Sequence, residues 1–251
     1  MSVYAAFHNP VKRSIRRKEV IYLRRFFSFA PFYIGVICIT LLGVRWGSRA
    51  VTVISESAPL KDRHTIIIDA GHGGVDGGAT SCTGVLESQL NLEIALRLND
   101  LLNLLGHRTN MIRTTDISVY TEGETVASKK VSDLKHRVKL INGTENAILI
   151  SIHQNYFTDS RYNGAQVFYS EHEDSSILAK TMQQGFCAVG STRAAKQSNG
   201  VYLMEHIQCP GILVECGFLS NPAEEQRLRT PDYQKRLCCI MASAVNIFLN
   251  T

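Results

Sequence analysis

Residues 66–78 read IIIDAGHGGVDGG, three isoleucines followed by a glycine-rich turn that holds one histidine. A short and wholly apolar run is typical of a strand covered on both faces, as in parallel sheets. Two more such runs occupy residues 148–150 and 212–214. Leucines at helical spacing fill 90–105, and Gly106 follows as a stop signal. This alternation predicts an α/β fold, a single domain with a mostly parallel central sheet flanked by helices.

Two further helices have recognisable ends. Leu134, Val138 and Ile141 form a short apolar face that Asn142 and Gly143 terminate. The last helix is expected to begin at Thr230-Pro231-Asp232, because a capping hydroxyl followed by proline favours a first turn. Its apolar face then buries the side chains of Leu237, Met241, Ala244 and Phe248.

The positive charge of the chain is concentrated near its start. The formal net charge of the 251 residues is +5, whereas residues 1–25 hold seven basic residues and one acidic residue, a net of +6. The remainder therefore carries −1, which excludes a basic groove for nucleic acid.

Residues 26–44 form an uncharged apolar stretch that follows this basic segment. Its length suits a helix crossing a hydrocarbon core of about 30 Å, and the basic flank places the N-terminus in the cytoplasm. We expect a basic cytoplasmic segment (1–25), a transmembrane anchor or uncleaved signal (26–44), a linker (45–63) and an extracytoplasmic catalytic domain (64–251). The alternative is a cleaved signal peptide, which also exports the domain.

Ionisable side chains follow the predicted strands at the edge where a ligand crevice is expected. His72 follows the first run, His153 the second, and Glu215 ends the third, while Glu87 lies just ahead of the leucine-rich helix. Two histidines and one carboxylate are the ligand set typical of catalytic zinc. We therefore expect His72, Glu87 and His153 to hold one Zn²⁺ per chain, and Glu215 to act as general base.

Other interpretations assign these residues differently. Singly, each histidine is more often structural than a ligand, and Glu87 is an acidic residue that the helix dipole favours. Cys216 next to the third run could act as a nucleophile with His153, which would leave His72 and Glu87 without a task. A serine hydrolase is excluded because a G-x-S-x-G element is absent from the sequence. A non-catalytic wall-binding module has no need of a general base.

Four separated motifs resemble the zinc-dependent N-acetylmuramoyl-L-alanine amidases of the amidase-3 type. They are residues 69–79 (DAGHGGVDGGA), Glu87, residues 151–155 (SIHQN) and residues 215–221 (ECGFLSN). The resemblance covers about residues 64–249. It implies hydrolysis of the amide bond between N-acetylmuramic acid and L-alanine in peptidoglycan, with glycan strands bearing stem peptides as the substrate.

The resemblance also implies a role for each matched residue. His72, Glu87 and His153 match the zinc ligands, and Glu215 matches the catalytic glutamate. Arg137 matches a recurrent arginine with a supportive role, and Asn155 of the His-x-Asn element is expected to support the site as well.

Within this family, residues 199–204 and the short N-terminal anchor look most like the branch that acts on spore cortex during germination. That branch removes stem peptides for muramic δ-lactam formation, which couples it to a peptidoglycan deacetylase. A vegetative cell-wall substrate and an inactive, anchored binding module are the alternatives, and the need for an activator protein is left open. Ser88 and Tyr156 replace a lysine and an alanine that are frequent in the family, which is expected to alter the rim that contacts substrate.

Overall fold

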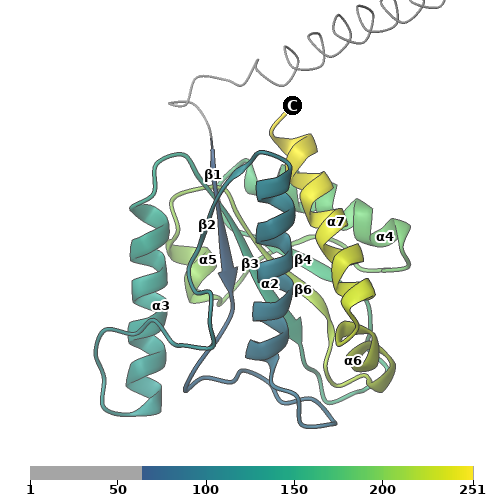
Figure 1. Ribbon diagram of the computed structural model, residues 1–251, viewed down its shortest axis with the longest axis horizontal. Coiled ribbons are helices and arrows are strands. Elements are labelled where there is room, and N and C mark those ends of the chain that lie inside the picture. The colour runs from purple at the N-terminus through teal and green to yellow at the C-terminus, as the bar shows by residue number, and fades with distance from the viewer. Residues whose placement is uncertain (1–63, 251) are drawn as a thin grey trace, which may run out of the picture. The chain divides into compact units, whose positions relative to one another are not determined.

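The computed structural model describes residues 64–250, whose six strands form one sheet in the order β2-β1-β3-β6-β4-β5 (Figure 1). The strands are β1 (Thr65–Ala70), β2 (Arg108–Met111), β3 (Ala147–Asn155), β4 (Gln166–Tyr169), β5 (Lys196–Gln197) and β6 (Gly211–Phe218). The helices are α2 (Glu87–Leu104), α3 (Val126–Asn142), α4 (Ser175–Ala188), α5 (Tyr202–His206), α6 (Pro222–Leu228) and α7 (Pro231–Phe248).

The three apolar runs become the central strands β1, β3 and β6, which run parallel to one another and to β2. The prediction of a mostly parallel sheet with flanking helices is therefore confirmed. β4 pairs antiparallel with β6 and parallel with β5, so these two short strands run against the rest. Both lie at one side of the sheet, and neither has a continuous apolar run long enough to reveal it in the sequence.

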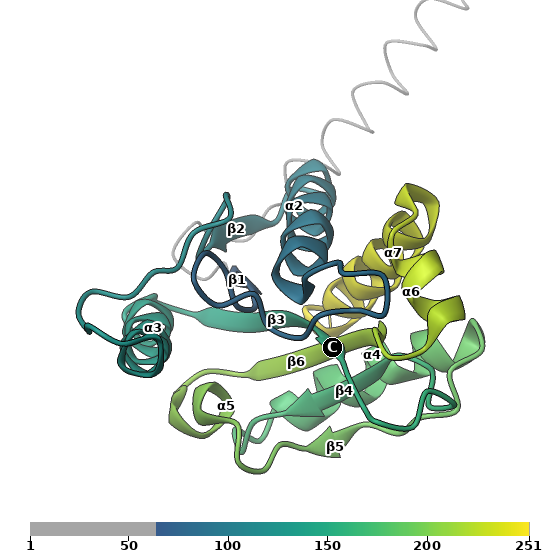
Figure 2. The same ribbon diagram turned by 90° about the horizontal axis from the view of Figure 1, so that it is seen from below.

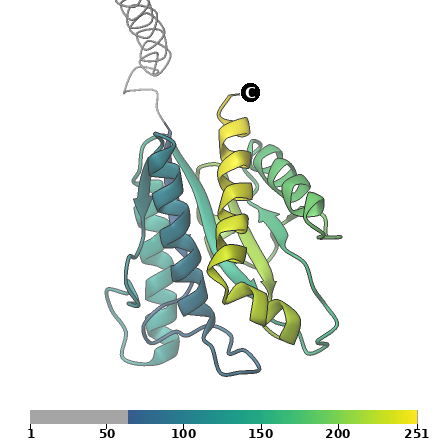
Figure 3. The ribbon, with the colours of Figure 1, turned by 45° about the vertical axis from the view of Figure 1, so that its right-hand side comes forward.

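Helices cover both faces of the sheet. Alternate side chains of the central strands point to opposite faces. One face packs against α2, α4 and α7, and the other packs against α3 and α5. Figure 3 shows α2 and α7 side by side over the first face. On β1, Ile66 and Ile68 belong to the larger core of that face, whereas Ile67 belongs to the smaller core beneath α3 and α5.

The helix boundaries follow the predicted signals with one difference. Thr230 caps α7 by accepting a hydrogen bond from the Tyr233 amide, and Gly106 after α2 has a left-handed φ of +85°. The glycine that ends α3, Gly143, has a φ of −81°, so this helix ends without the left-handed residue that terminal glycines usually supply.

The predicted cytoplasmic segment 1–25, the anchor 26–44 and the linker 45–63 lie outside the described residues. Within residues 64–250, none of the helices combines the length and apolarity needed to cross a bilayer.

Candidate metal centre

The candidate site lies at the edge of the sheet where the parallel strands β1 and β3 end, the edge that faces the viewer in Figure 2. The chain leaves β1 in the glycine-rich turn that carries His72, while β3 extends to His153 and beyond. The turn is followed by a loop that leads to Glu87, the first residue of α2. Two neighbouring segments and a third that lies 66 residues beyond Glu87 therefore meet at one edge.

His72 is held in an uncommon backbone conformation by its surroundings. Its φ of +60° lies in the left-handed region, which non-glycine residues rarely occupy outside strained or functional sites. Its Nδ1 atom lies 2.9 Å from Oδ2 of Asp76, and Oδ1 of Asp76 lies 2.7 Å from Nζ of Lys130. This carboxylate fixes the ring so that Nε2 points toward Glu87, as in the carboxylate–histidine pairs that orient metal ligands.

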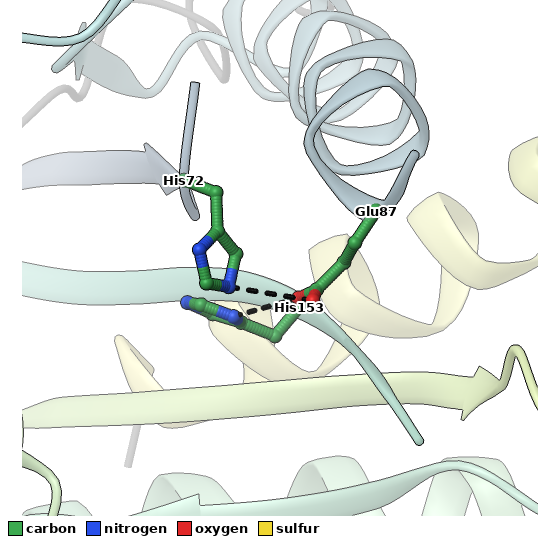
Figure 4. Close-up of side chains that lie close together, drawn as sticks. All are labelled: His72, Glu87 and His153. Atoms are coloured by element: carbon green, nitrogen blue, oxygen red, sulfur yellow. Dashed lines mark hydrogen bonds and ion pairs between the residues drawn. The ribbon is translucent and has the colours of Figure 1, made fainter. Parts of the chain in front are cut away.

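Glu87 is the centre of the cluster. Its side chain is 5% exposed, and its oxygens lie 3.3 Å from Nε2 of His72 and 3.0 Å from Nδ1 of His153 (Figure 4). The amides of Ala79 and Gln154 donate hydrogen bonds to the same carboxylate at 2.9 and 3.1 Å. Both carboxylate oxygens are thereby fixed toward the two imidazoles.

Glycine is required where the turn passes the His153 ring. A Cβ atom added at Gly71 would lie 2.2 Å from Nε2 of His153, a distance that no side chain tolerates. At Gly71, and at Gly78 beside Glu87, the absence of a side chain lets the backbone approach the side chains of the site itself.

The three side chains fit a divalent cation. Their donor atoms all lie within 4.8 Å of one another, and the His72 and His153 rings are edge-on at 5.0 Å between centroids. Two atoms that each lie about 2.0–2.1 Å from a tetrahedral ion are about 3.3 Å apart, which is the separation of His72 Nε2 and Glu87 Oε2. A metal ion could thus bind with little rearrangement.

The electrostatics of the cluster also favour a cation. Burial opposes protonation of His72, but the hydrogen bond and negative charge of Glu87 outweigh it and raise the pKa of His72 to about 9. Burial alone would raise the pKa of Glu87, whereas its hydrogen bonds to His153 and His72 lower it well below the usual range. Glu87 therefore stays ionised, and its negative charge attracts positive charge to the cluster.

Glu215 lies beside this cluster on the neighbouring strand. It pairs in register with His153, so both side chains project from the same face of the sheet. Its Oε2 atom is buried and has no hydrogen-bond partner among the described residues. Burial raises the pKa of Glu215 to about 7, a value suited to a group that accepts and returns a proton near neutrality.

Arg137 lies beneath the His72 turn, where it also lines a cleft beside the site. Its guanidinium forms an ion pair with the buried Asp69 and another with Asp133. It also donates hydrogen bonds to the carbonyls of Ala70 and His72, the latter at 2.8 Å. Burial would lower the pKa of Arg137, but the two aspartates outweigh it, so the charge is retained.

Arg113 is a second buried arginine, and no sequence pattern indicates its role. Only 2% of it is exposed, and it donates to the carbonyls of Ala70, Gly71 and Ser88 at 2.8–3.0 Å. These carbonyls belong to the His72 turn and to the first turn of α2. Arg113 follows a short and mostly polar edge strand, and that context is equally typical of an exposed arginine.

The other predicted residues have clear positions. Asn155 ends β3 opposite Phe218, and its carbonyl accepts a hydrogen bond from the Leu219 amide. Cys216 points away from His153 into the core on the α2 and α7 face, since consecutive strand residues face opposite sides. Burial also raises its pKa, so Cys216 lacks both the access and the ionisation that a nucleophile needs.

A cleft of about 290 Å³ opens beside the metal-ligand candidates on the α3 and α5 face. Its lining includes His72 and His153 and the apolar side chains of Leu134, Val201 and Leu203. The half-exposed Lys130 lines it as well. The cluster is therefore accessible from a recess whose lining is partly apolar and partly charged.

Comparison with known proteins identifies this arrangement. The family model described as N-acetylmuramoyl-L-alanine amidase matches residues 66–246, which include the whole candidate site. The chain belongs to this amidase family. Its members are hydrolases that cleave the N-acetylmuramoyl-L-alanine bond of peptidoglycan.

Individual relatives of the amidase agree with this assignment. It is 36% identical over 219 residues to the germination-specific N-acetylmuramoyl-L-alanine amidase of Bacillus subtilis strain 168, covering 86% of this chain and 92% of the relative. It resembles the CwlD amidase of Clostridioides difficile, solved in complex with the GerS lipoprotein, with 34% identity and a TM-score of 0.72. That match covers 75% of this chain and 99% of the other. An N-acetylmuramoyl-L-alanine amidase of Clostridium difficile 630 matches with 30% identity and a TM-score of 0.66, over 76% of this chain and 98% of the other.

Proposed function

We propose that this chain is a zinc-dependent amidase that removes stem peptides from spore-cortex peptidoglycan. The observation that carries the proposal is the convergence of His72, Glu87 and His153, with the unpartnered carboxylate of Glu215 beside them. A cation ligand set next to a carboxylate that can take up a proton suits amide hydrolysis by water.

The three ligand candidates would hold one Zn²⁺ per chain. When bound there, Zn²⁺ would polarise the lactyl carbonyl and lower the pKa of water toward neutrality. Asp76 keeps the His72 ring oriented through Nδ1, and the Ala79 and Gln154 amides keep the Glu87 carboxylate oriented. The ligand side chains thus need little reorganisation.

Glu215 acts as the proton carrier. It accepts a proton from the attacking water as the water oxygen bonds to the carbonyl carbon. It then delivers this proton to the alanine nitrogen as the carbon–nitrogen bond breaks. The products are a muramoyl lactyl carboxylate and a stem peptide with a free amino terminus. Arg137 supports this site by holding the His72 turn, and Asn155 supports it by closing β3 against the end of β6.

Cortex as the substrate is supported by the germination-specific relative, which the chain covers over 92% of its length. Removal of a stem peptide leaves the muramic acid that a deacetylase would convert toward the δ-lactam. The lipoprotein bound to the CwlD amidase suggests that a lipoprotein partner acts on this chain as well. We place the enzyme outside the cytoplasmic membrane, anchored through residues 26–44, from the charge pattern of the sequence.

The test is incubation of the full chain with purified cortex or vegetative peptidoglycan, with Zn²⁺ or with a chelator, while new L-alanine amino termini are counted. Zinc-dependent release from cortex is expected. Release from vegetative wall alone would overturn the cortex assignment and favour a vegetative amidase.

A Glu215→Gln variant separates metal binding from proton transfer. We expect it to bind one Zn²⁺ while turnover falls by at least about 100-fold. Near-normal turnover of this variant would refute the role of Glu215. A wild-type chain that binds peptidoglycan and zinc but releases no amino termini, with or without a lipoprotein partner, would be a binding module.

A further inference from the structure

The exposed aromatic side chains of the described residues all lie in one loop, between β3 and β4. They are Tyr156, Phe157 and Tyr162, with 52%, 50% and 44% of their surface exposed. Every other phenylalanine and tyrosine within residues 64–250 is partly or fully buried. We call these three side chains the aromatic patch. Exposed apolar side chains that gather in one place are typical of a contact surface.

The aromatic patch is continuous with the candidate metal centre. Tyr156 follows His153 by three residues, a chain length of about 10 Å in an extended strand. The Tyr162 ring stacks on Phe218 at 6.2 Å, and Phe218 ends β6, the strand that carries Glu215. Both strands of the site therefore lead directly into the patch.

The loop that carries the aromatic patch is held from beneath. The buried carboxylate of Glu224 accepts hydrogen bonds from the Gly164 and Phe218 amides at 3.0 and 2.9 Å. The side chain of Asn221 donates to the Ser160 carbonyl at 2.9 Å, and the Phe157 amide donates to the Ser220 hydroxyl. A loop fixed at both ends presents its rings at a low entropic cost for binding.

The chemistry around the rings fits a carbohydrate. Phe157 and Tyr162 meet edge to face at 4.9 Å, which leaves ring surface open to solvent. Arg193 lies 5.3 Å from the Tyr162 centroid, and its guanidinium donors lie beside the patch. Sugar rings offer apolar C–H faces that stack on aromatic rings, and polar edges that accept hydrogen bonds. The residues between the rings are mostly polar, among them Asp159 and Arg161, unlike the apolar centre of a protein interface.

We propose that the aromatic patch is a glycan-binding platform, on which sugar rings of a peptidoglycan strand stack while one muramoyl residue of that strand lies at the candidate metal centre. The proposal rests on the proposed amidase function and adds how the enzyme holds its polymeric substrate. The platform follows the metal-ligand strand directly, so a strand of two or more sugars reaches both. Tyr156, one of the family departures noted in the sequence, then contributes to substrate binding.

The first experiment measures binding without hydrolysis. The probe is a set of soluble oligomers of N-acetylglucosamine and N-acetylmuramic acid without stem peptides, which contain no bond that the amidase cleaves. In calorimetry with the full chain, the triple variant Tyr156→Ser, Phe157→Ser, Tyr162→Ser should bind at least about 10-fold more weakly than wild type. The ring-preserving variants Tyr156→Phe and Phe157→Tyr should bind within about twofold of wild type.

The matched control is Ile177→Ser on α4, an apolar side chain of equal exposure (51%) outside the loop. It should bind the oligomers as wild type does. Equal binding by the triple variant, with an unchanged melting temperature, would overturn the platform and would leave a protein partner as the occupant of the patch. A wild-type chain that does not bind the oligomers would overturn it as well.

The second experiment compares two substrates. The triple variant should lose at least about 10-fold more kcat/KM on peptide-bearing glycan oligomers than on N-acetylmuramoyl-L-alanyl-D-isoglutamine, which has a single sugar. Equal losses on both substrates would contradict the platform. A wild-type chain that hydrolyses neither substrate but still binds the oligomers through the patch would refute the proposed function and leave the platform intact.

Discussion

The Nη2 atom of Arg113 lies 2.8 Å from the carbonyl oxygen of Ser88. The same nitrogen lies 3.0 Å from the carbonyl of Gly71. One buried guanidinium thus connects the residue before His72 with the residue after Glu87. The planar fork of arginine can reach several carbonyls at fixed angles, which the single ammonium of lysine cannot do. The distance between two metal-ligand candidates therefore depends on a side chain that touches neither of them.

Replacing Arg113 with lysine should weaken zinc binding while leaving the chain folded. Lysine keeps the charge but cannot maintain all of these hydrogen bonds, so the His72 turn and the start of α2 become less well fixed. The zinc dissociation constant, measured by chelator competition, should rise about 10–100-fold, as for other residues that orient metal ligands.

Gln234→Leu is the matched control, because Gln234 is also fully buried and bridges α2, α6 and α7 away from the site. It should lower the melting temperature and leave the zinc affinity unchanged. If both variants lost stability to the same extent and neither altered zinc affinity, Arg113 would be purely structural.

A methyl group at Gly71 should exclude the His153 ring from its position. The added Cβ atom would lie 2.2 Å from Nε2 of His153, so Gly71→Ala must displace either the ring or the turn. We expect stoichiometric zinc binding to be lost. Gly106→Ala introduces the same methyl group at a left-handed residue with nothing within 4 Å, at a strain cost of about 1 kcal/mol. This control should bind zinc normally, and Gly71→Ala protein that did so too would contradict the assigned ligand geometry.

The fold and the convergence of His72, Glu87, His153 and Glu215 at one edge of the sheet could be predicted because they leave local signals. Apolar runs marked β1, β3 and β6, and polar residues immediately after them marked the crevice. Arg113 left no such signal, since its role depends on carbonyls 25 and 42 residues away. The antiparallel β4 was also missed, because a strand of four residues carries too few side chains for a period to be recognised.

Removing the Cys216 thiol should leave catalysis intact. Cys216 is fully buried in the core opposite His153 and its pKa is raised by burial, so it takes no part in a proton or acyl transfer. Cys216→Ala should keep zinc-dependent turnover within about twofold of wild type, with a loss of stability of about 1 kcal/mol from the small cavity. Turnover that disappeared in a folded, zinc-loaded variant would restore the cysteine mechanism.

The ion pair between Asp69 and Arg137 should make the stability of the fold sensitive to acid. Burial would raise the pKa of Asp69, but the Arg137 guanidinium outweighs burial and lowers it. A carboxyl whose pKa is lower in the folded state stabilises the fold fully above its unfolded pKa, about 3.9, and this contribution is lost as the pH falls through the folded value.

Asp69→Asn leaves Arg137 with Asp133 as its remaining ionic partner, and should lower the free energy of unfolding at pH 7 by about 3 kcal/mol. In urea titrations, the difference in free energy of unfolding between wild type and variant should stay constant from pH 7 to about pH 5. It should become smaller below about pH 4. The control is Asp159→Asn, which removes an exposed ion pair with Arg161. Its free energy of unfolding should equal that of wild type at every pH. If the difference in free energy of unfolding between wild type and Asp69→Asn instead increased toward low pH, the Asp69 carboxyl would be protonated in the folded protein. Arg137 would then be stabilised by other groups.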